Sequence, residues 1–168
     1  TSFTGKYEKQ GFKTPSGKVE LYSTILEKFG YEPLPVYREP AESPISKPEL
    51  AKEYPLICNN GMKPLVHTHS QFHDLPWIKE IFPEPFAALN PATAQQYSIK
   101  DGERVIIESP RASVRLKAKI TKAVPPNTVF IPHGGKEPLY NDLTDDKMVD
   151  PIGGGFSTRA FLCRLRKV

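Results

Sequence analysis

The chain has 168 residues, enough for one ordinary domain with a sizeable core and a short additional segment. Its net charge of +4 is mild, and Lys and Arg are interleaved with Asp and Glu, so the basic block typical of a nucleic-acid-binding protein is missing. Only Cys58 and Cys163 are present, too few for an iron–sulfur or zinc cluster built from this chain alone. No apolar run approaches the roughly 20 residues of a membrane span, and the first residues lack the features of a signal peptide. Because the first residue is Thr rather than Met, we expect a piece of a longer protein.

The first 52 residues predict an arm and a linker rather than part of a core. A turn over residues 14–17 precedes residues 18–22, which alternate like a short strand. A short helix should follow, with Thr24 and Glu27 as a capping box and Gly30 at its end. Prolines at 33, 35, 40, 44, 48 and 55 then favour an extended chain. We therefore predict three parts: an arm over 1–32 that belongs to a preceding domain, a proline-rich linker over 33–52, and an autonomous domain over 53–168.

The predicted elements of the autonomous domain are mostly short strands. Residues 54–58 are apolar and lead into a turn at Asn59-Asn60-Gly61. Asn90 and Pro91 begin one compact helix, as N-cap and first helical residue. Two strands over 103–109 and 113–121 should pair as a hairpin, since the second alternates apolar and charged residues without a break. Two further strands are predicted over 128–132 and 160–166, with a long irregular stretch between them. The pattern predicts a small, mostly antiparallel β-barrel with one or two short helices.

Several stretches, in the same order, resemble the C-terminal domain of the dimethyl-sulfoxide-reductase superfamily of molybdenum and tungsten enzymes. They are residues 11–23 (GFKTPSGKVELYS), 54–57 with the glycine turn after them, 69–71 (HSQ), 89–111, and 141–155 with NDLT and DPIGGG. The resemblance implies a double-psi-type six-stranded β-barrel, mainly β with short helices, preceded by an extended arm. It also implies that the chain binds molybdopterin guanine dinucleotide for a larger oxidoreductase. The TPSGK and HSQ segments look most like the thiosulfate and polysulfide reductase branch.

A dinucleotide of this kind needs cations and N–H groups for its diphosphate, and amide-like partners for its pterin and guanine. The resemblance assigns these contacts to nine residues: Asn59, Asn60, Gly61, Lys63, His69, Ser70, Gln71, Asn141 and Arg159. Where the family often has Thr-Gly-Arg, this chain has Asn60-Gly61-Met62, so Lys63 is expected to replace the guanidinium. No catalytic residue and no metal ligand is expected in this chain.

The metal, molybdenum or tungsten, and an iron–sulfur cluster would be held by the missing domains of the parent subunit. Those domains and the parent's electron-transfer subunits are the expected partners, besides the cofactor itself, and neither nucleic acid nor a membrane segment is expected. The sequence does not distinguish molybdenum from tungsten, the periplasm from the cytoplasm, or one parent substrate from another.

Two functions of other classes stay open. His67, His69 and His73 lie within seven residues and could hold a metal in a small metal-binding or hydrolase protein, although no fourth ligand is well spaced apart from Asp74. An OB-like nucleic-acid-binding barrel would need aromatic residues on an exposed strand face. The exposed face of 113–121 instead carries Arg115, Lys117 and Lys119, which we expect to be a solvated surface.

Overall fold

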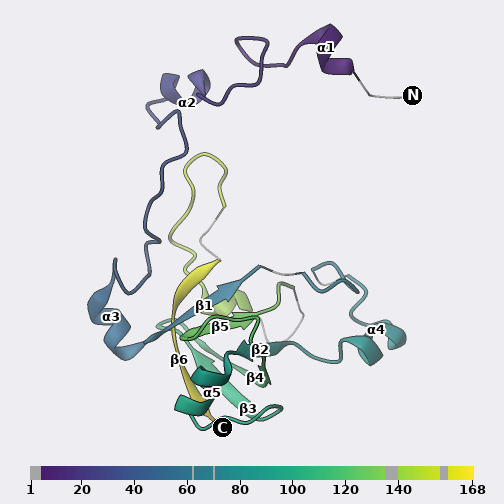
Figure 1. Cartoon of the computed structure of the whole chain (residues 1–168), viewed down its shortest axis with the longest axis vertical. Coiled ribbons are helices and arrows are strands. Elements are labelled where there is room, and N and C mark those ends of the chain that lie inside the picture. The colour runs from purple at the N-terminus through teal and green to yellow at the C-terminus, as the bar shows by residue number, and fades with distance from the viewer. Residues whose placement is uncertain (1–4, 62, 70, 135–139, 156–158) are drawn as a thin grey trace. The chain divides into compact units, whose positions relative to one another are not determined.

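Figure 1 shows the computed structural model of the protein, which describes residues 5–61, 63–69, 71–134, 140–155 and 159–168. The chain divides into two compact units, Thr1–Arg38 and Glu39–Val168, and all six strands lie in the second unit. Among the described helices, none is long and apolar enough to cross a membrane.

The first unit contains two short helices, α1 (Lys6–Gln10) and α2 (Thr24–Lys28). The predicted helix is confirmed, but its cap is one residue earlier than expected. Ser23 is the N-cap, and its hydroxyl accepts a hydrogen bond from the backbone N–H of Leu26 at 3.3 Å. Either residue can cap a helix, since Ser and Thr both carry the oxygen that the first-turn N–H groups need.

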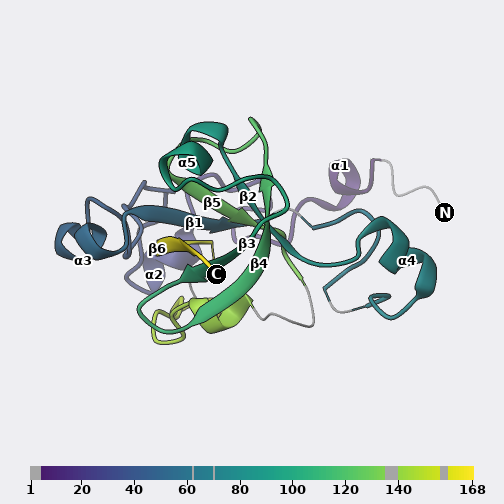
Figure 2. The ribbon, with the colours of Figure 1, turned by 90° about the horizontal axis from the view of Figure 1, so that it is seen from below.

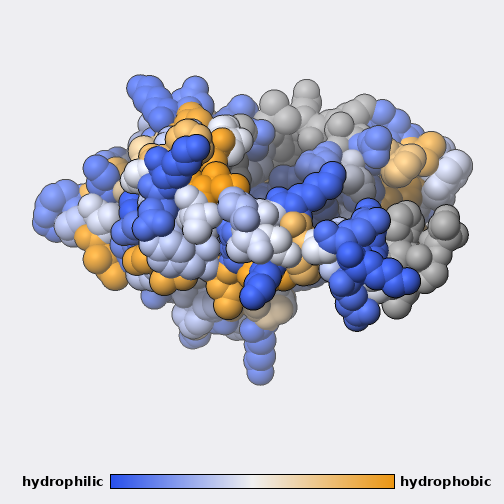
Figure 3. Space-filling view, turned by 90° about the horizontal axis from the view of Figure 1, so that it is seen from above, coloured by the Kyte–Doolittle hydropathy of each residue, from blue (hydrophilic) through white to orange (hydrophobic). Residues whose placement is uncertain are grey.

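The strand predicted over residues 18–22 is wrong. This segment has no strand partner in the described part of the chain, and alternation alone does not satisfy the backbone groups of a strand. The Glu20 carboxylate instead accepts from the backbone N–H of Ser16 at 3.0 Å, which closes a local turn. Val19 and Leu21 are exposed, as are several other large apolar side chains of this unit. Figure 3 shows hydrophobic and hydrophilic residues interspersed over the coloured part of one face of the molecule.

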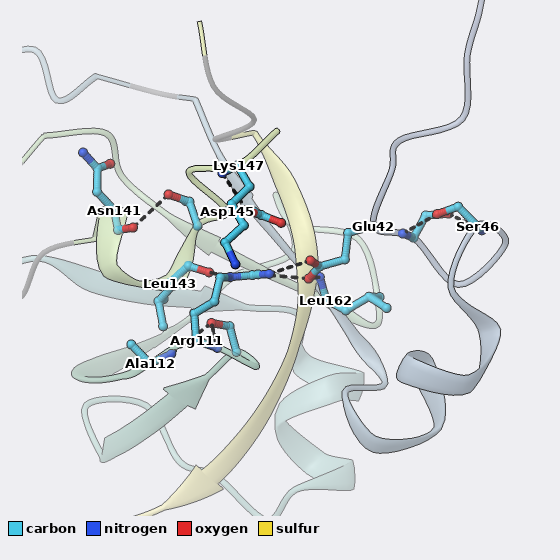
Figure 4. A network of polar contacts seen from close by, with 12 residues as sticks. Glu42, Ser46, Arg111, Ala112, Asn141, Leu143, Asp145, Lys147 and Leu162 are labelled. Carbon is cyan, nitrogen blue, oxygen red and sulfur yellow. Dashed lines mark hydrogen bonds and ion pairs between the residues drawn. The ribbon is translucent and has the colours of Figure 1, made fainter. Parts of the chain in front are cut away.

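The predicted linker is only partly extended, because its last residues form the helix α3 (Pro48–Glu53). A proline at the first helical position does not break a helix, since its missing N–H would have no intrahelical partner there. Upstream of α3, Glu42 ties the segment to the barrel. Its carboxylate receives two bonds from the Arg111 guanidinium, at 2.7 and 3.1 Å, and one from the backbone N–H of Leu162 at 2.8 Å. Figure 4 shows these groups converging beside the barrel.

The strands form one closed barrel in the order β1-β5-β2-β4-β3-β6. β1 runs parallel to β5 and β2 parallel to β4, while the other four neighbouring pairs are antiparallel. The predicted six-stranded barrel of the double-psi type with short helices is confirmed. The bounds are β1 (Leu56–Asn60), β2 (Phe86–Leu89), β3 (Arg104–Glu108), β4 (Ser113–Ile120), β5 (Thr128–Ile131) and β6 (Ala160–Lys167).

The β3–β4 hairpin and the alternation of β4 follow the prediction closely. Val114, Leu116 and Ala118 are buried, whereas the charged residues between them are exposed. The turn needs no left-handed residue at Ala112, because the Ser109 hydroxyl accepts from the N–H groups of Arg111 and Ala112 at 3.2 and 3.4 Å. The side chain of Ser109 therefore stabilises this turn.

Three further helices occur in the second unit: α4 (Pro76–Ile81), α5 (Pro91–Gln96) and the 3-10 helix η1 (Tyr140–Leu143). The predicted cap of α5 is confirmed, since the Asn90 side chain accepts from the N–H of Ala92 at 2.9 Å. In Figure 2, which views the barrel from below, α5 lies beside β2 and β5, whereas α4 stands away from the strands.

The interior of the barrel is apolar and includes both cysteines as free thiols. Cys58 on β1 and Cys163 on β6 are completely buried. Burial raises the pKa of the Cys58 thiol well above its usual value, and a hydrogen bond with Cys163 adds to this effect. Both cysteines therefore act as small apolar core residues rather than as nucleophiles.

Candidate functional site

Three chain segments meet at one end of the barrel because of how β1, β5 and β6 pair. β1 and β5 are parallel and in register at their ends, with Asn60 opposite Ile131, so both chains leave the barrel at the same end. β6 is antiparallel to β1, and Asn60 donates its backbone N–H to the carbonyl of Arg159, just before β6 begins. The segments after β1, after β5 and before β6 therefore share one edge. We call the residues gathered there, Asn60, Lys63, His69, His133 and Arg159, the rim.

The turn predicted at Asn59-Asn60-Gly61 begins two residues later than expected, because Asn59 and Asn60 still belong to β1. Their side chains therefore lie on opposite faces of the strand. Asn60 is buried, with 4% of its surface exposed, and its Nδ2 donates to the Ile131 carbonyl at 3.2 Å. Asn59 instead lines a shallow groove of about 370 Å³ on the outside of the barrel, next to Phe86, Thr128 and Phe130.

His133 connects the segment after β5 to the segment after β1. One ring nitrogen, Nδ1, lies 3.0 Å from Asn60 Oδ1, and the other, Nε2, lies 3.0 Å from His69 Nδ1. The approach depends on Gly134, whose φ of +87° suits glycine. A Cβ atom at position 134 would lie 2.8 Å from the backbone oxygen of His69, so any larger residue would push the two segments apart.

The rim is cationic. Burial lowers the pKa of His133, and the charges of His69, Lys63 and Arg159 lower it further. His133 is therefore held neutral, while the Lys63 and Arg159 side chains carry the positive charge. A cluster of two cations beside neutral imidazole and amide groups suits a ligand that is anionic at one part and carries polar heterocycles at another.

Two residues before His69, the chain carries a buried histidine. His67 is 4% exposed, and neither of its ring nitrogens has a hydrogen-bond partner in the described part of the chain. Its ring packs against His73, with centroids 3.9 Å apart, and against Phe82 at 5.1 Å. Burial lowers the pKa of His67, and the charge of His73 lowers it further; the nearby His69 backbone opposes this only in part. Buried polar groups without partners are rare, so these nitrogens are candidates for contacting a ligand.

The profile of the family described as "Molydopterin dinucleotide binding domain" matches residues 56–162, from the start of β1 into β6. The chain belongs to this family. Acetylene hydratase of Syntrophotalea acetylenica is 39% identical over 93% of this chain and 25% of its own length. Dopamine dehydroxylase of Eggerthella lenta is 31% identical over 95% of this chain and 17% of its own length.

The thiosulfate reductase molybdopterin-containing subunit PhsA of Salmonella typhimurium is 35% identical over 74% of this chain and 15% of its own length. The solved structure of acetylene hydratase from Pelobacter acetylenicus superposes with a TM-score of 0.79 at 35% identity, covering 95% of this chain and 24% of that one. The chain thus spans a quarter or less of the length of these relatives.

The rim fits the molybdopterin dinucleotide that the family implies. Lys63 and Arg159 are cations of the kind that a diphosphate needs, and the His67 ring nitrogens, which lack a hydrogen-bond partner among the described residues, are polar groups of the kind that a heterocycle needs. Gly134 lets the segment after β5 lie against the His69 backbone, where a Cβ atom would not fit. These features follow from the structure of this chain itself and agree with the family assignment.

The structure brings four of the nine predicted site residues together: Asn60, Lys63, His69 and Arg159. Gly61 comes directly after Asn60 in the chain and is exposed. Gln71 is exposed near His69, where its N–H donates to the Thr68 carbonyl at 2.9 Å. Ser70 lies outside the described residues.

Asn141 and Asn59 lie elsewhere. Asn141 is an exposed residue of η1, and its backbone oxygen accepts from the Thr144 hydroxyl at 2.8 Å. Figure 4 shows its side chain pointing away from the Arg111 network. Within the described segments, no hydrogen bond or ion pair joins Asn141 to the rim, and Asn59 faces the outer groove.

The sequence prediction missed His133, Gly134 and the burial of His67. A usable signal was present, because Pro132-His133-Gly134 places a histidine and a glycine directly after a short apolar strand. Recognising it required knowing that β5 runs parallel to β1.

The features behind the two alternative functions have other roles in the structure. Within the described residues, no group of three or more His, Cys, Asp or Glu is placed to hold a metal ion. Of the basic residues on β4, Lys117 pairs with Glu84 at 2.7 Å, and Lys119 lies over the Phe86 ring at 4.6 Å. This arrangement supports the prediction of a solvated strand face.

Proposed function

We propose that the chain binds molybdopterin guanine dinucleotide at the rim, as the C-terminal cofactor-binding domain of a larger molybdenum or tungsten oxidoreductase. The observation that carries this proposal is the hydrogen-bonded group Asn60–His133–His69, flanked by the cationic Lys63 and Arg159 at one end of the barrel. Directional polar groups beside two cations match the heterocycles and the diphosphate of a dinucleotide.

In this proposal Lys63 and Arg159 neutralise the diphosphate, and the polar rim residues orient a heterocycle. Gly61, Ser70, Gln71 and Asn141 stay proposed contacts on the strength of the family resemblance. When bound, the cofactor supplies the metal at which the parent enzyme's chemistry occurs. The chain itself contributes affinity and orientation, and none of its residues is assigned a catalytic role.

The parent protein is also part of the proposal. Relatives four or more times longer than the matched region support a chain that works with further domains, to which an arm over residues 1–32 and a linker over 33–52 would lead. We place the parent in the thiosulfate and polysulfide reductase-like branch, a placement that the 35% identity to PhsA supports. An iron–sulfur cluster and electron-transfer subunits would belong to that parent.

Guanosine diphosphate binding by the chain tests the proposal. We expect weak binding, with Kd on the order of 1 mM, because the other domains that would cover the ligand are absent. Lys63→Ala and Arg159→Ala should each weaken binding by about three- to tenfold, since each removes a charge-assisted contact to phosphate.

Arg115→Ala is the matched control. Arg115 is an exposed cation on β4, which lies opposite β1 in the ring of six strands. If Arg115→Ala weakens binding as much as Arg159→Ala does, the nucleotide is attracted by general charge, and the rim is not its site.

A further inference from the structure

The rim contains a hydrogen-bond chain whose direction is fixed at one end. Asn60 Nδ2 lies 3.2 Å from the Ile131 carbonyl, which can only accept. The amide nitrogen of Asn60 must therefore face Ile131, because the flipped amide would place two acceptors against each other. Asn60 Oδ1 then faces His133 Nδ1 at 3.0 Å, and this nitrogen must carry a proton.

The proton on His133 Nδ1 also fixes the tautomer of His69. A neutral imidazole carries one N–H, so a proton on His133 Nδ1 leaves a lone pair on Nε2. That lone pair faces His69 Nδ1 at 3.0 Å, and a hydrogen bond between two nitrogens needs one proton. His69 must therefore donate from Nδ1, which leaves its own Nε2 without a proton. The groups that act on His133 are His69, Lys63 and Arg159, all cationic or able to become so, and they favour its neutral form.

We propose that this hydrogen-bond chain holds His69 in the Nδ1–H tautomer. The rim then presents the lone pair of His69 Nε2 to an N–H donor on a bound heterocycle. The ligand edge that fits is a lactam or amino N–H of the kind that guanine and pterins carry, and His69 is a specificity-determining residue for it. This inference rests on the proposed function. His69 is exposed, and within the described segments its Nε2 makes no hydrogen bond, so it is available to a ligand.

The tautomers can be measured directly in the unliganded chain labelled with 15N-histidine, by two-bond 1H–15N correlation at pH 8. We expect Nδ1–H signals for His69 and His133. His73 is an internal reference for the other tautomer, because its Nε2 donates to the backbone oxygen of His69 at 2.7 Å. A spectrum in which His69 carries its proton on Nε2, or averages both forms as free histidine does, would overturn the proposal.

A pair of glycine variants tests whether the hydrogen-bond chain sets the tautomer of His69. Gly134→Ala separates the segments of His69 and His133 without removing a polar group, since the new Cβ atom would meet the His69 backbone. Gly102→Ala is the control, because Gly102 has a similar φ of +78° but no atom within 4 Å of the added Cβ. His69 should lose the Nδ1–H tautomer in Gly134→Ala and keep it in Gly102→Ala. If His69 keeps the Nδ1–H tautomer in both variants, the hydrogen-bond chain does not set its tautomer.

Guanosine monophosphate and its N1-methyl derivative test the ligand. The methyl group removes an N–H donor, so binding should be at least about threefold weaker in the wild type and equal for the two ligands in Gly134→Ala. Equal binding in the wild type refutes the assigned specificity. If neither nucleotide shifts the rim signals, the proposed function and the specificity fail together. The tautomer spectrum independently tests whether His69 is held in the Nδ1–H form.

Discussion

Replacing Arg111 should destabilise the barrel much more than replacing an exposed cation. Its guanidinium makes two bonds to the Glu42 carboxylate, and its Nε donates to the Leu143 carbonyl at 2.8 Å. The side chains of Arg111 and Glu42 are only 24% and 15% exposed, so water screens the pair incompletely. Arg111 also lies over the Phe161 ring at 5.6 Å. One residue thus joins the 39–47 segment, η1 and β6.

The size of the effect can be worked from these contacts. Hydrogen bonds that involve a charged group contribute roughly 1.5–3 kcal/mol, and removing one partner leaves the other poorly solvated. We therefore expect Arg111→Ala to lower the free energy of unfolding by about 2–3 kcal/mol. Glu42→Gln should cost about 1–2 kcal/mol, because the amide oxygen can still accept from the N–H of Leu162.

Urea denaturation of the chain measures both values, with an unchanged m value as the condition for comparing them. Lys52→Ala is the control, since Lys52 and Glu49 pair at 2.7 Å but are 72% and 83% exposed. That variant should change the stability by less than about 0.5 kcal/mol. If Arg111→Ala falls within the same range, the Glu42–Arg111 contact does not stabilise the fold and the reasoning is refuted.

Four further predictions concern buried side chains and the helices that precede the barrel. His67→Leu should raise the stability by about 1 kcal/mol, because it removes a buried group without hydrogen bonds. Burial lowers the pKa of both His67 and His133, so the unfolded chain binds protons at these residues before the folded chain does as the pH falls below about 6.5. Urea melts should therefore show the free energy of unfolding declining from about pH 6.5 toward pH 5, and the decline should be less steep in His67→Leu. Cys58 and Cys163 should resist DTNB in the folded chain and react in urea; labelling faster than global unfolding would contradict their burial. In amide exchange, α2 should exchange quickly because it has five residues, whereas the N–H of Tyr54, bonded to the Leu50 carbonyl, should be protected; equal protection would refute this difference.

Elements whose hydrogen bonds and burial are local could be predicted from the sequence. β4 alternates over its whole length, and α5 begins with the Asn90 cap, so both were found close to their observed bounds. β2 was missed because Phe86–Leu89 is a short apolar run without alternation, and its partners β4 and β5 come later in the chain. The segment 18–22 shows the converse, since alternation without a partner strand does not make a strand.

The site was predicted in part for the same reason. Asn60, Lys63, His69 and Arg159 were proposed from the sequence, which could not show that they meet. The contact between His69 and His133 joins residues 64 positions apart and exists only because β1 and β5 are parallel neighbours. Asn59 was assigned to the site with Asn60, although the pleat of β1 turns their side chains to opposite faces.

Chemical-shift mapping with guanosine diphosphate tests the central claim most directly. At pH 7.5 the account predicts concentration-dependent shifts in the ring signals of His69 and His133 and in the backbone amides of Asn60 and Arg159. Shifts confined to Arg115, Lys117 and Lys119 on β4, with none at the rim, would contradict it.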